Sequence, residues 1–90
     1  MEQKTVLVIE DSQYLADSLV DMLKISNYKP TTANTGRTGI SKAIEQKPDL
    51  ILLDIRLPDI DGYEVYKQVR SNDWGKNARV IILTASESID

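Results

Sequence analysis

One stretch near the middle of the chain constrains the fold more than any other. An aliphatic run, Leu50–Leu53, ends on Asp54; a loop containing Pro58 follows, and Asp61 and Gly62 then open the next predicted helix. Four consecutive large aliphatic residues are typical of a strand buried on both faces, as in a parallel sheet. Asp54 would then lie at the carboxyl end of such a strand, where ligands collect in open α/β sheets. We therefore take Asp54 as the candidate functional centre.

Predicted strands and helices alternate along the rest of the chain. Further strands are predicted at Val6–Ile9, Tyr28–Ala33 and Val80–Leu83, with helices from Tyr14 to about Ser26, from the Asn34-Thr35-Gly36 turn to Pro48, and from Gly62 to about Arg70. The order β-α-β-α-β-α-β implies right-handed crossovers and a parallel sheet covered on both faces. Pro30 favours an edge position for its strand, because proline cannot donate to a central ladder.

Local patterns refine these elements. In the first helix the apolar face is predicted to consist of Leu15, Leu19, Met22 and Leu23. Ser12 or Asp11 is a suitable N-cap for that helix, and Asp61 for the third. The segment 71–77 is predicted to be a polar loop.

The composition of the chain limits which classes of function are possible. Ninety residues allow one small domain, 1–90, and 41% hydrophobic with 28% charged residues is ordinary for a globular protein. A net charge of −3 without a basic cluster argues against nucleic-acid binding by this segment. The absence of cysteine and histidine excludes disulfides, thiolate or imidazole metal sites and Ser-His-Asp catalysis. No apolar run approaches the roughly 20 residues of a membrane span, and no secretory signal precedes the first strand, so we expect a cytoplasmic protein.

Oxygen-bearing side chains end three of the predicted strands: Glu10 and Asp11, Asp54, and Thr84. In a parallel sheet these ends meet at one edge. Crowded carboxylates repel, which raises the pKa of one or more of them, and a divalent cation resolves the conflict. Mg²⁺ suits a site of few carboxylates that leaves positions for phosphate oxygens. Asp54 can then act as a nucleophile toward phosphorus, with Thr84 donating its hydroxyl to a phosphoryl oxygen.

These motifs together resemble the receiver domain of two-component response regulators. The matching features are Glu10-Asp11, Pro48-Asp49 before Leu50–Leu53, Asp54, the loop Leu57-Pro58-Asp59-Ile60-Asp61-Gly62, and Thr84-Ala85. The resemblance covers the whole chain and implies a flavodoxin-like (CheY-like) doubly wound sheet, here with strand order 2-1-3-4.

The resemblance also implies roles for individual residues. Asp54 is the expected phosphoacceptor for a sensor histidine kinase or phosphotransfer protein, and Thr84 the hydroxyl that senses the phosphoryl group. Glu10, Asp11, Asp54 and the backbone carbonyl of Arg56 are the expected Mg²⁺ shell. Arg56 and Ser86 occupy variable positions that tune loss of the phosphoryl group. Such a module is a signalling protein, not an enzyme.

The chain departs from the family pattern at its end. The family has a fifth strand and helix, and a lysine at the end of that strand which pairs with the phosphoryl group; the chain stops before them. We therefore expect impaired phosphorylation. We also expect self-association through the exposed aliphatic strand Val80–Leu83, because an unprotected edge is a template for pairing.

Three other functions are compatible with parts of the sequence. An aspartate-nucleophile phosphatase of the haloacid dehalogenase kind needs a second aspartate two residues after the first, where this chain has Arg56. A fragment that only folds and associates, with a relic site, is a third reading. A dinucleotide-binding fold is disfavoured because no Gly-x-Gly-x-x-Gly follows the first strand. We expect Asp59 to be solvated, and the side chain of Trp74 to be half-exposed and to contribute to packing.

Overall fold

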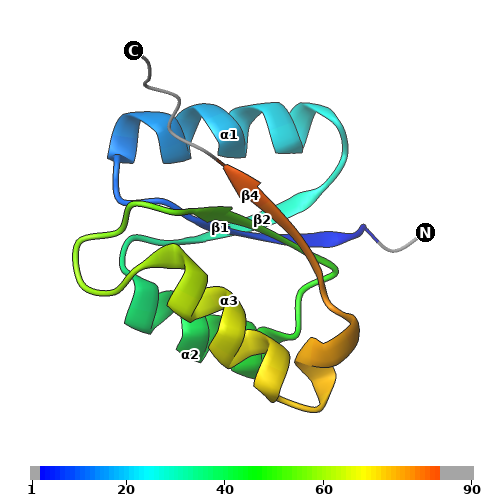
Figure 1. Ribbon diagram of the computed structural model, residues 1–90. Helices are drawn as coiled ribbons and strands as arrows, with labels where there is room; N and C mark the ends of the chain where they lie inside the picture. Colours follow the sequence, from blue (N-terminus) through cyan, green and yellow to red (C-terminus); the bar gives the residue numbers. More distant parts are fainter. Residues whose placement is uncertain (1–2, 84–90) are drawn as a thin grey trace.

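A computed structural model describes residues 3–83. It contains a parallel sheet with helices on both faces, as predicted. The elements are β1 (Thr5–Ile9), α1 (Gln13–Ile25), β2 (Lys29–Ala33), α2 (Gly36–Gln46), β3 (Leu50–Asp54), α3 (Gly62–Ser71), a 3₁₀ turn η1 (Trp74–Asn77) and β4 (Arg79–Leu83). Helix α1 covers one face, and α2 and α3 cover the other (Figure 1).

The strand order is β2-β1-β3-β4, which confirms the predicted 2-1-3-4 arrangement. β2 carries Pro30 and lies at one edge, as expected. Within the described residues, β4 pairs only with β3 and forms the other edge. The central strands β1 and β3 are paired on both sides, which explains why their sequences are almost wholly aliphatic.

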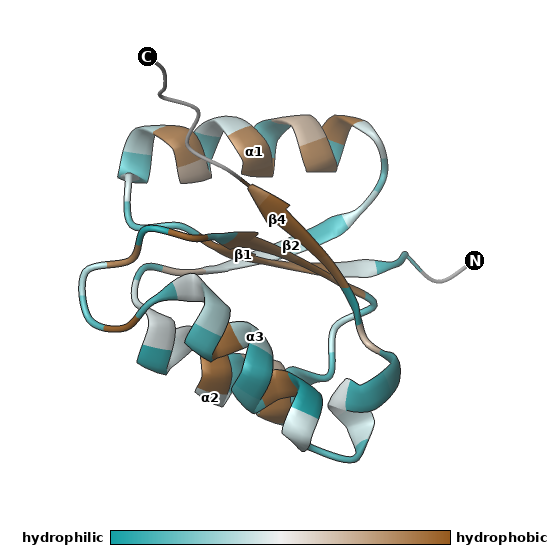
Figure 2. Ribbon diagram, in the orientation of Figure 1, coloured by the Kyte–Doolittle hydropathy of each residue, from teal (hydrophilic) through white to brown (hydrophobic). Residues whose placement is uncertain are grey.

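The core has two layers, one on each face of the sheet, and the strands carry most of its apolar surface (Figure 2). On the α2–α3 side the largest fully buried side chains are Leu7, Ile9, Ile51, Leu53, Val65 and Val69. The α1 side is smaller and contains Val6, Val8 and Leu52. The central strands β1 and β3 are therefore covered on both faces, and their carboxyl ends lie side by side.

The apolar face of α1 is narrower than the predicted one. Ala16 is buried, and Leu19 and Leu23 pack on the sheet, whereas Leu15 is 49% and Met22 63% exposed. A helix lying on a sheet covers only the stripe that faces it, and no other element among residues 3–83 packs over the flank that carries these two side chains. Leu15 and Met22 therefore lie at the exposed margin of the apolar face that the sequence predicts, and only Leu19 and Leu23 of its four residues pack on the sheet.

The helix ends follow the local sequence. Ser12 is the N-cap of α1, and Asp61 caps α3 by accepting from the Tyr63 amide at 2.7 Å. Asn27 takes the left-handed conformation after α1, with φ 68°. The predicted polar loop 71–77 contains η1, which the sequence did not indicate because four residues are too few to show a helical period.

Candidate metal centre

The register of the sheet brings two strand ends into line. Ile9 of β1 lies opposite Leu53 of β3, so Glu10 and Asp54, the next residue on each strand, are neighbours at the carboxyl edge. The ladder continues one step beyond β1, because the Glu10 amide donates to the Ala33 carbonyl at 3.0 Å. The backbone of Glu10 is thus tied to β2, beside Asp54 at the end of β3.

Three carboxylates gather at this edge. Glu10, Asp11 and Asp54 each offer an oxygen, and these oxygens lie within 4.8 Å of one another. Glu10 and Asp54 are only 5% and 9% exposed, while Asp11 is exposed. Burial raises the pKa of Glu10, and the neighbouring charge of Asp54 raises it further, against the opposing hydrogen bond from the Ser12 amide. The group is therefore electrostatically strained in the absence of a cation.

This donor set fits Mg²⁺. The ion takes hard oxygen ligands, accepts one or two carboxylates, and keeps water in its other positions. A divalent charge among three carboxylates offsets both the burial and the neighbouring charge of Asp54 that raise the pKa of Glu10. The residues present can hold such an ion, and one side of the cluster is open to solvent through Asp11.

Backbone amides orient two of the carboxylates. The Ser12 amide donates to Glu10 Oε2 at 3.1 Å, and the Arg56 amide donates to Asp54 Oδ1 at 3.2 Å. Each bond comes from a residue two positions later in the chain, where the strand has just turned into its loop. The carboxylates are thus fixed by the way the chain leaves β1 and β3.

The loop after β3 folds tightly back on the strand. The Gly62 amide donates to the Ile55 carbonyl at 2.8 Å. A Cβ on Gly62 would lie 2.6 Å from both the Asp54 carbonyl oxygen and Ile55 Cα, so only glycine fits there. Asp61-Gly62 is therefore structural, in the capping and tight-loop role expected from the sequence.

The structure brings together three of the predicted site residues, Glu10, Asp11 and Asp54, and Arg56 lies next to them through its backbone. Thr84 and Ser86 lie outside the described residues. The roles assigned to all of these residues remain predictions.

Asp59 is an exposed residue, as expected, but the sequence did not reveal that its carboxylate has fixed partners. Its carboxylate accepts from the Gly36 amide at 2.7 Å and the Arg37 amide at 2.9 Å. Partial burial raises its pKa, but the backbone hydrogen bonds outweigh that effect and leave the pKa below its usual value. No local spacing signals this contact, since the partners lie more than 20 residues away in the chain.

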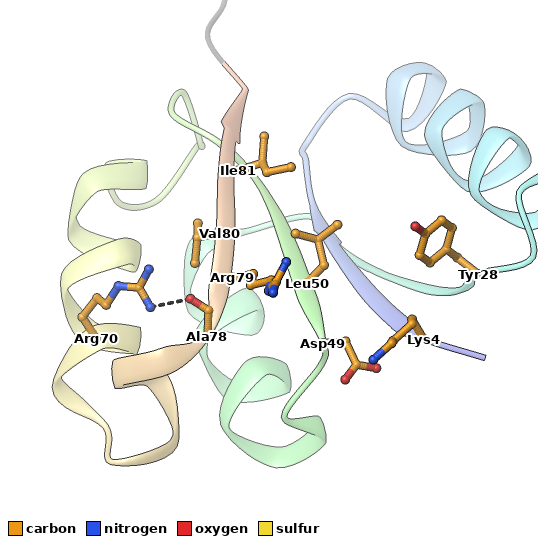
Figure 3. Close-up of a pocket in the computed structure, with 9 residues that line it drawn as sticks. All are labelled: Lys4, Tyr28, Asp49, Leu50, Arg70, Ala78, Arg79, Val80 and Ile81. Carbon is orange, nitrogen blue, oxygen red and sulfur yellow. Dashed lines mark hydrogen bonds between the residues drawn. The ribbon is translucent and has the colours of Figure 1, made fainter. Parts of the chain in front are cut away.

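A shallow hollow of about 860 Å³ lies at the opposite end of the sheet. Figure 3 shows its lining at the start of β4, with Val80 and Ile81 on the strand and Arg70 reaching across to the Ala78 carbonyl. Arg70 also donates to the Gly75 carbonyl at 2.7 Å, so this arginine fastens η1 to α3. The hollow belongs to the amino ends of the strands and takes no part in the acidic cluster.

None of the helices described here is long and apolar enough to cross a membrane.

The family model for the response regulator receiver domain matches residues 6–90. The chain is 36% identical over 86 residues to a probable transcriptional regulatory protein, TcrX, from Mycobacterium tuberculosis, covering 96% of this chain and 36% of the relative. It is 34% identical over 82 residues to the polar-differentiation response regulator DivK from Brucella anthropi, covering 91% and 67%. The chain thus spans about a third of the matched transcriptional regulator.

Solved structures agree on the fold. The receiver domain of a LuxO repressor protein from Vibrio parahaemolyticus superposes with a TM-score of 0.86 at 36% identity, covering 98% of this chain and 66% of that one. The receiver domain of a sensor histidine kinase from Pseudomonas aeruginosa has a TM-score of 0.90 at 31% identity, with coverage of 93% and 69%. That second structure holds a magnesium ion coordinated in its active site cleft.

Proposed function

The chain belongs to the family of response regulator receiver domains, which are phosphoacceptor signalling modules, and on that premise we propose that Asp54 receives a phosphoryl group from a sensor histidine kinase or phosphotransfer protein. Residues 1–90 would act as one receiver unit in the cytoplasm, without contact to nucleic acid. The observation that carries it is the buried Asp54 carboxylate beside two further carboxylates.

In the proposed reaction an oxygen of Asp54 attacks the phosphorus of a phosphohistidine. A carboxylate O–P bond forms and the P–N bond breaks, with its electron pair passing to the leaving imidazole, so the product is an acyl phosphate. The Arg56 amide, bonded to Asp54 Oδ1 at 3.2 Å, fixes the orientation of the nucleophile. Thr84 is proposed to donate its hydroxyl to a phosphoryl oxygen, and Arg56 and Ser86 to tune loss of the group.

Glu10, Asp11, Asp54 and the Arg56 carbonyl are proposed to hold Mg²⁺. When bound, the ion neutralises the charge that develops on the transferred group. Glu10 contributes a carboxylate already aimed by the Ser12 amide. Asp11, the exposed member, leaves the approach to Asp54 open to a phosphodonor.

Phosphorylation by a small phosphodonor tests the proposal. The chain treated with acetyl phosphate and Mg²⁺ is expected to gain the mass of one phosphoryl group, and removal of Mg²⁺ by chelation is expected to prevent the gain. Asp54→Asn is expected to abolish it, whereas the matched change Asp73→Asn, at a fully exposed side chain, is expected to leave it intact. Equal labelling of the Asp54→Asn variant would refute the assignment.

A phosphoryl mimic distinguishes the proposed function from the alternative in which the fragment only folds and associates and its site is a relic. Beryllium fluoride with Mg²⁺ is expected to change the amide spectrum around Asp54. Mg²⁺ binding without any response to the mimic would favour a relic site. For a protein made of these 90 residues alone we also propose a lower extent of phosphorylation than in a receiver domain that carries the family's lysine, measured side by side with the same donor.

We further propose that this 90-residue chain self-associates through β4. Among the described residues the outer edge of β4 has no partner strand, and Ile81 is 52% exposed although the strand is aliphatic. Exposed aliphatic edges pair readily with one another. Pairing of two β4 strands across a two-fold axis would cover both edges at once.

Sedimentation analysis at micromolar concentration tests this assembly. The chain is expected to form a dimer, and Ile81→Lys, which places a charge beside the edge, is expected to shift it toward the monomer. Ile25→Lys makes the same change at a side chain that is 86% exposed on α1, and is expected to leave the dimer unchanged. A monomeric parent chain would contradict the proposal.

A further inference from the structure

The loop between β3 and α3 touches the start of α2 through Asp59. Both carboxylate oxygens are used, one on the Gly36 amide at 2.7 Å and the other on the Arg37 amide at 2.9 Å. The side chain is only 23% exposed. The Arg37 side chain adds little, because it lies 3.9 Å away and is itself 77% exposed. The contact is therefore a link between the loop and the backbone of the helix.

Two features of the N-terminus of α2 allow this loop to pack closely against it. The first amides of a helix lack partners within the helix, and a negative charge beside them is favourable. Thr35 satisfies the Thr38 amide at 3.1 Å and leaves the two earlier amides for Asp59. A Cβ on Gly36 would lie 2.5 Å from Ile60 Cγ1, so the absence of a side chain is what allows the loop to approach so closely.

The same loop carries part of the acidic site. Its first residues follow Asp54 directly, and the Arg56 amide holds Asp54 Oδ1. At the far end Gly62 ties back to Ile55. Between these two points, Leu57 and Ile60 pack on the core, and Asp59 makes the hydrogen bonds that join the middle of the loop to α2.

We propose that Asp59 is a positioning residue for the metal centre. Its hydrogen bonds to the N-terminus of α2 hold residues 55–60 in the conformation that orients Asp54 and presents the Arg56 carbonyl to Mg²⁺. This inference rests on the proposed function, because it assigns Asp59 an effect on that same site. Partners that orient metal ligands without touching the metal commonly change affinity by about 10–100-fold when removed. We expect the low end of that range, since only one of the expected ligands lies in the loop.

The test compares Asp59→Ala, Asp59→Asn and Arg37→Ala at a temperature where each is fully folded. Mg²⁺ titration followed by amide NMR is expected to show about tenfold weaker binding for Asp59→Ala, and a smaller loss for Asp59→Asn, which keeps one acceptor. Arg37→Ala retains both backbone amides and is expected to bind as the parent does. In the metal-free protein the Arg56 amide resonance is expected to move in Asp59→Ala, because its bond to Asp54 loosens.

A purely structural role would give a different pattern. Asp59→Ala would then lower the melting temperature and speed hydrogen exchange at Gly36 and Arg37, while Mg²⁺ affinity and the Arg56 resonance stayed as in the parent. That result overturns the inference alone, and if Asp59→Ala fails to fold, Asp59→Asn decides in the same way. Absence of Mg²⁺ binding by the parent chain would instead overturn the proposed function, and the inference with it.

Discussion

Replacing Asp54 with asparagine is expected to stabilise the metal-free protein while removing its function. Its carboxylate lies within 4.8 Å of those of Glu10 and Asp11. At that separation two unit charges repel by about 3 kcal/mol at an effective dielectric constant of about 20. Asp11 is exposed and screened by salt, so the pair with Glu10 dominates. Solvent on the open side of the cluster screens part of this repulsion, so we expect a net gain of about 1–2 kcal/mol at neutral pH.

The pH dependence of this gain has a definite sign. A carboxyl group whose pKa is raised in the folded state destabilises that state when ionised. The penalty from Glu10 is therefore present above its raised pKa, and it disappears as the pH falls toward the ordinary value of 4.5. Burial, which is the larger cause of the shift, remains in the Asp54→Asn variant, but the contribution from the charge of Asp54 is lost. The stability difference between the two proteins is expected to shrink as the pH falls through this window.

Thermal unfolding followed by circular dichroism measures the effect. In low salt with a chelator at pH 7.5, each kcal/mol is expected to raise the melting temperature by about 4–8 °C. Mg²⁺ at a hundredfold excess over its dissociation constant adds about 2.7 kcal/mol to the parent, and less to Asp54→Asn, which has lost a ligand. Asp73→Asn, whose carboxylate is fully exposed, is expected to change stability by less than about 0.5 kcal/mol. A variant no more stable than the parent without Mg²⁺ would refute the electrostatic reasoning.

Three further predictions concern parts of the fold away from the acidic cluster. Lys47 ends α2 in the left-handed conformation, with φ 49°, so Lys47→Gly is expected to stabilise the protein by about 0.5–1 kcal/mol. In the same chemical denaturation assay the control Lys24→Gly, within α1, is expected to lower the free energy of unfolding by about 1 kcal/mol. A Cβ on Gly75 would lie 1.7 Å from a backbone carbonyl oxygen of α3, so Gly75→Ala is expected to cost about 1–3 kcal/mol or more; unchanged stability would show that η1 moves freely. Backbone hydrogen bonding at the start of β1 lowers the pKa of Asp49 below 3.8, so its stabilisation is present above that pH and lost as the pH falls through the lowered pKa. Asp49→Asn should therefore flatten the acid unfolding curve below about pH 4.

The sheet and its acidic edge could be predicted because both depend on short-range signals. The aliphatic run Leu50–Leu53 indicates a strand buried on both faces, and a carboxylate directly after it must lie at the strand end. Parallel alternation then brings Glu10 to the same edge as Asp54 without any knowledge of side-chain packing. The strand order itself came from the family resemblance, not from these patterns.

The features that sequence reasoning missed depend on contacts between distant segments. The periodicity of α1 identifies an apolar face but not how much of it a neighbour covers, and Met22 is 63% exposed for that reason. The turn η1 forms where Arg70 holds the Gly75 and Ala78 carbonyls, and those contacts exist only after α3 and β4 are in place. Asp59 has its partners on a helix more than 20 residues earlier.

The two loops that supply the site differ in how much support they need. After β1 the chain enters α1 within three residues, and the Ser12 side chain and amide serve the helix and Glu10 together. After β3 seven residues precede α3, which is too long a span to be fixed by its ends alone. The middle of that loop is held by the packing of Leu57 and Ile60 on the core and by the hydrogen bonds of Asp59 to α2, and only the second of these contacts fixes the loop to a backbone.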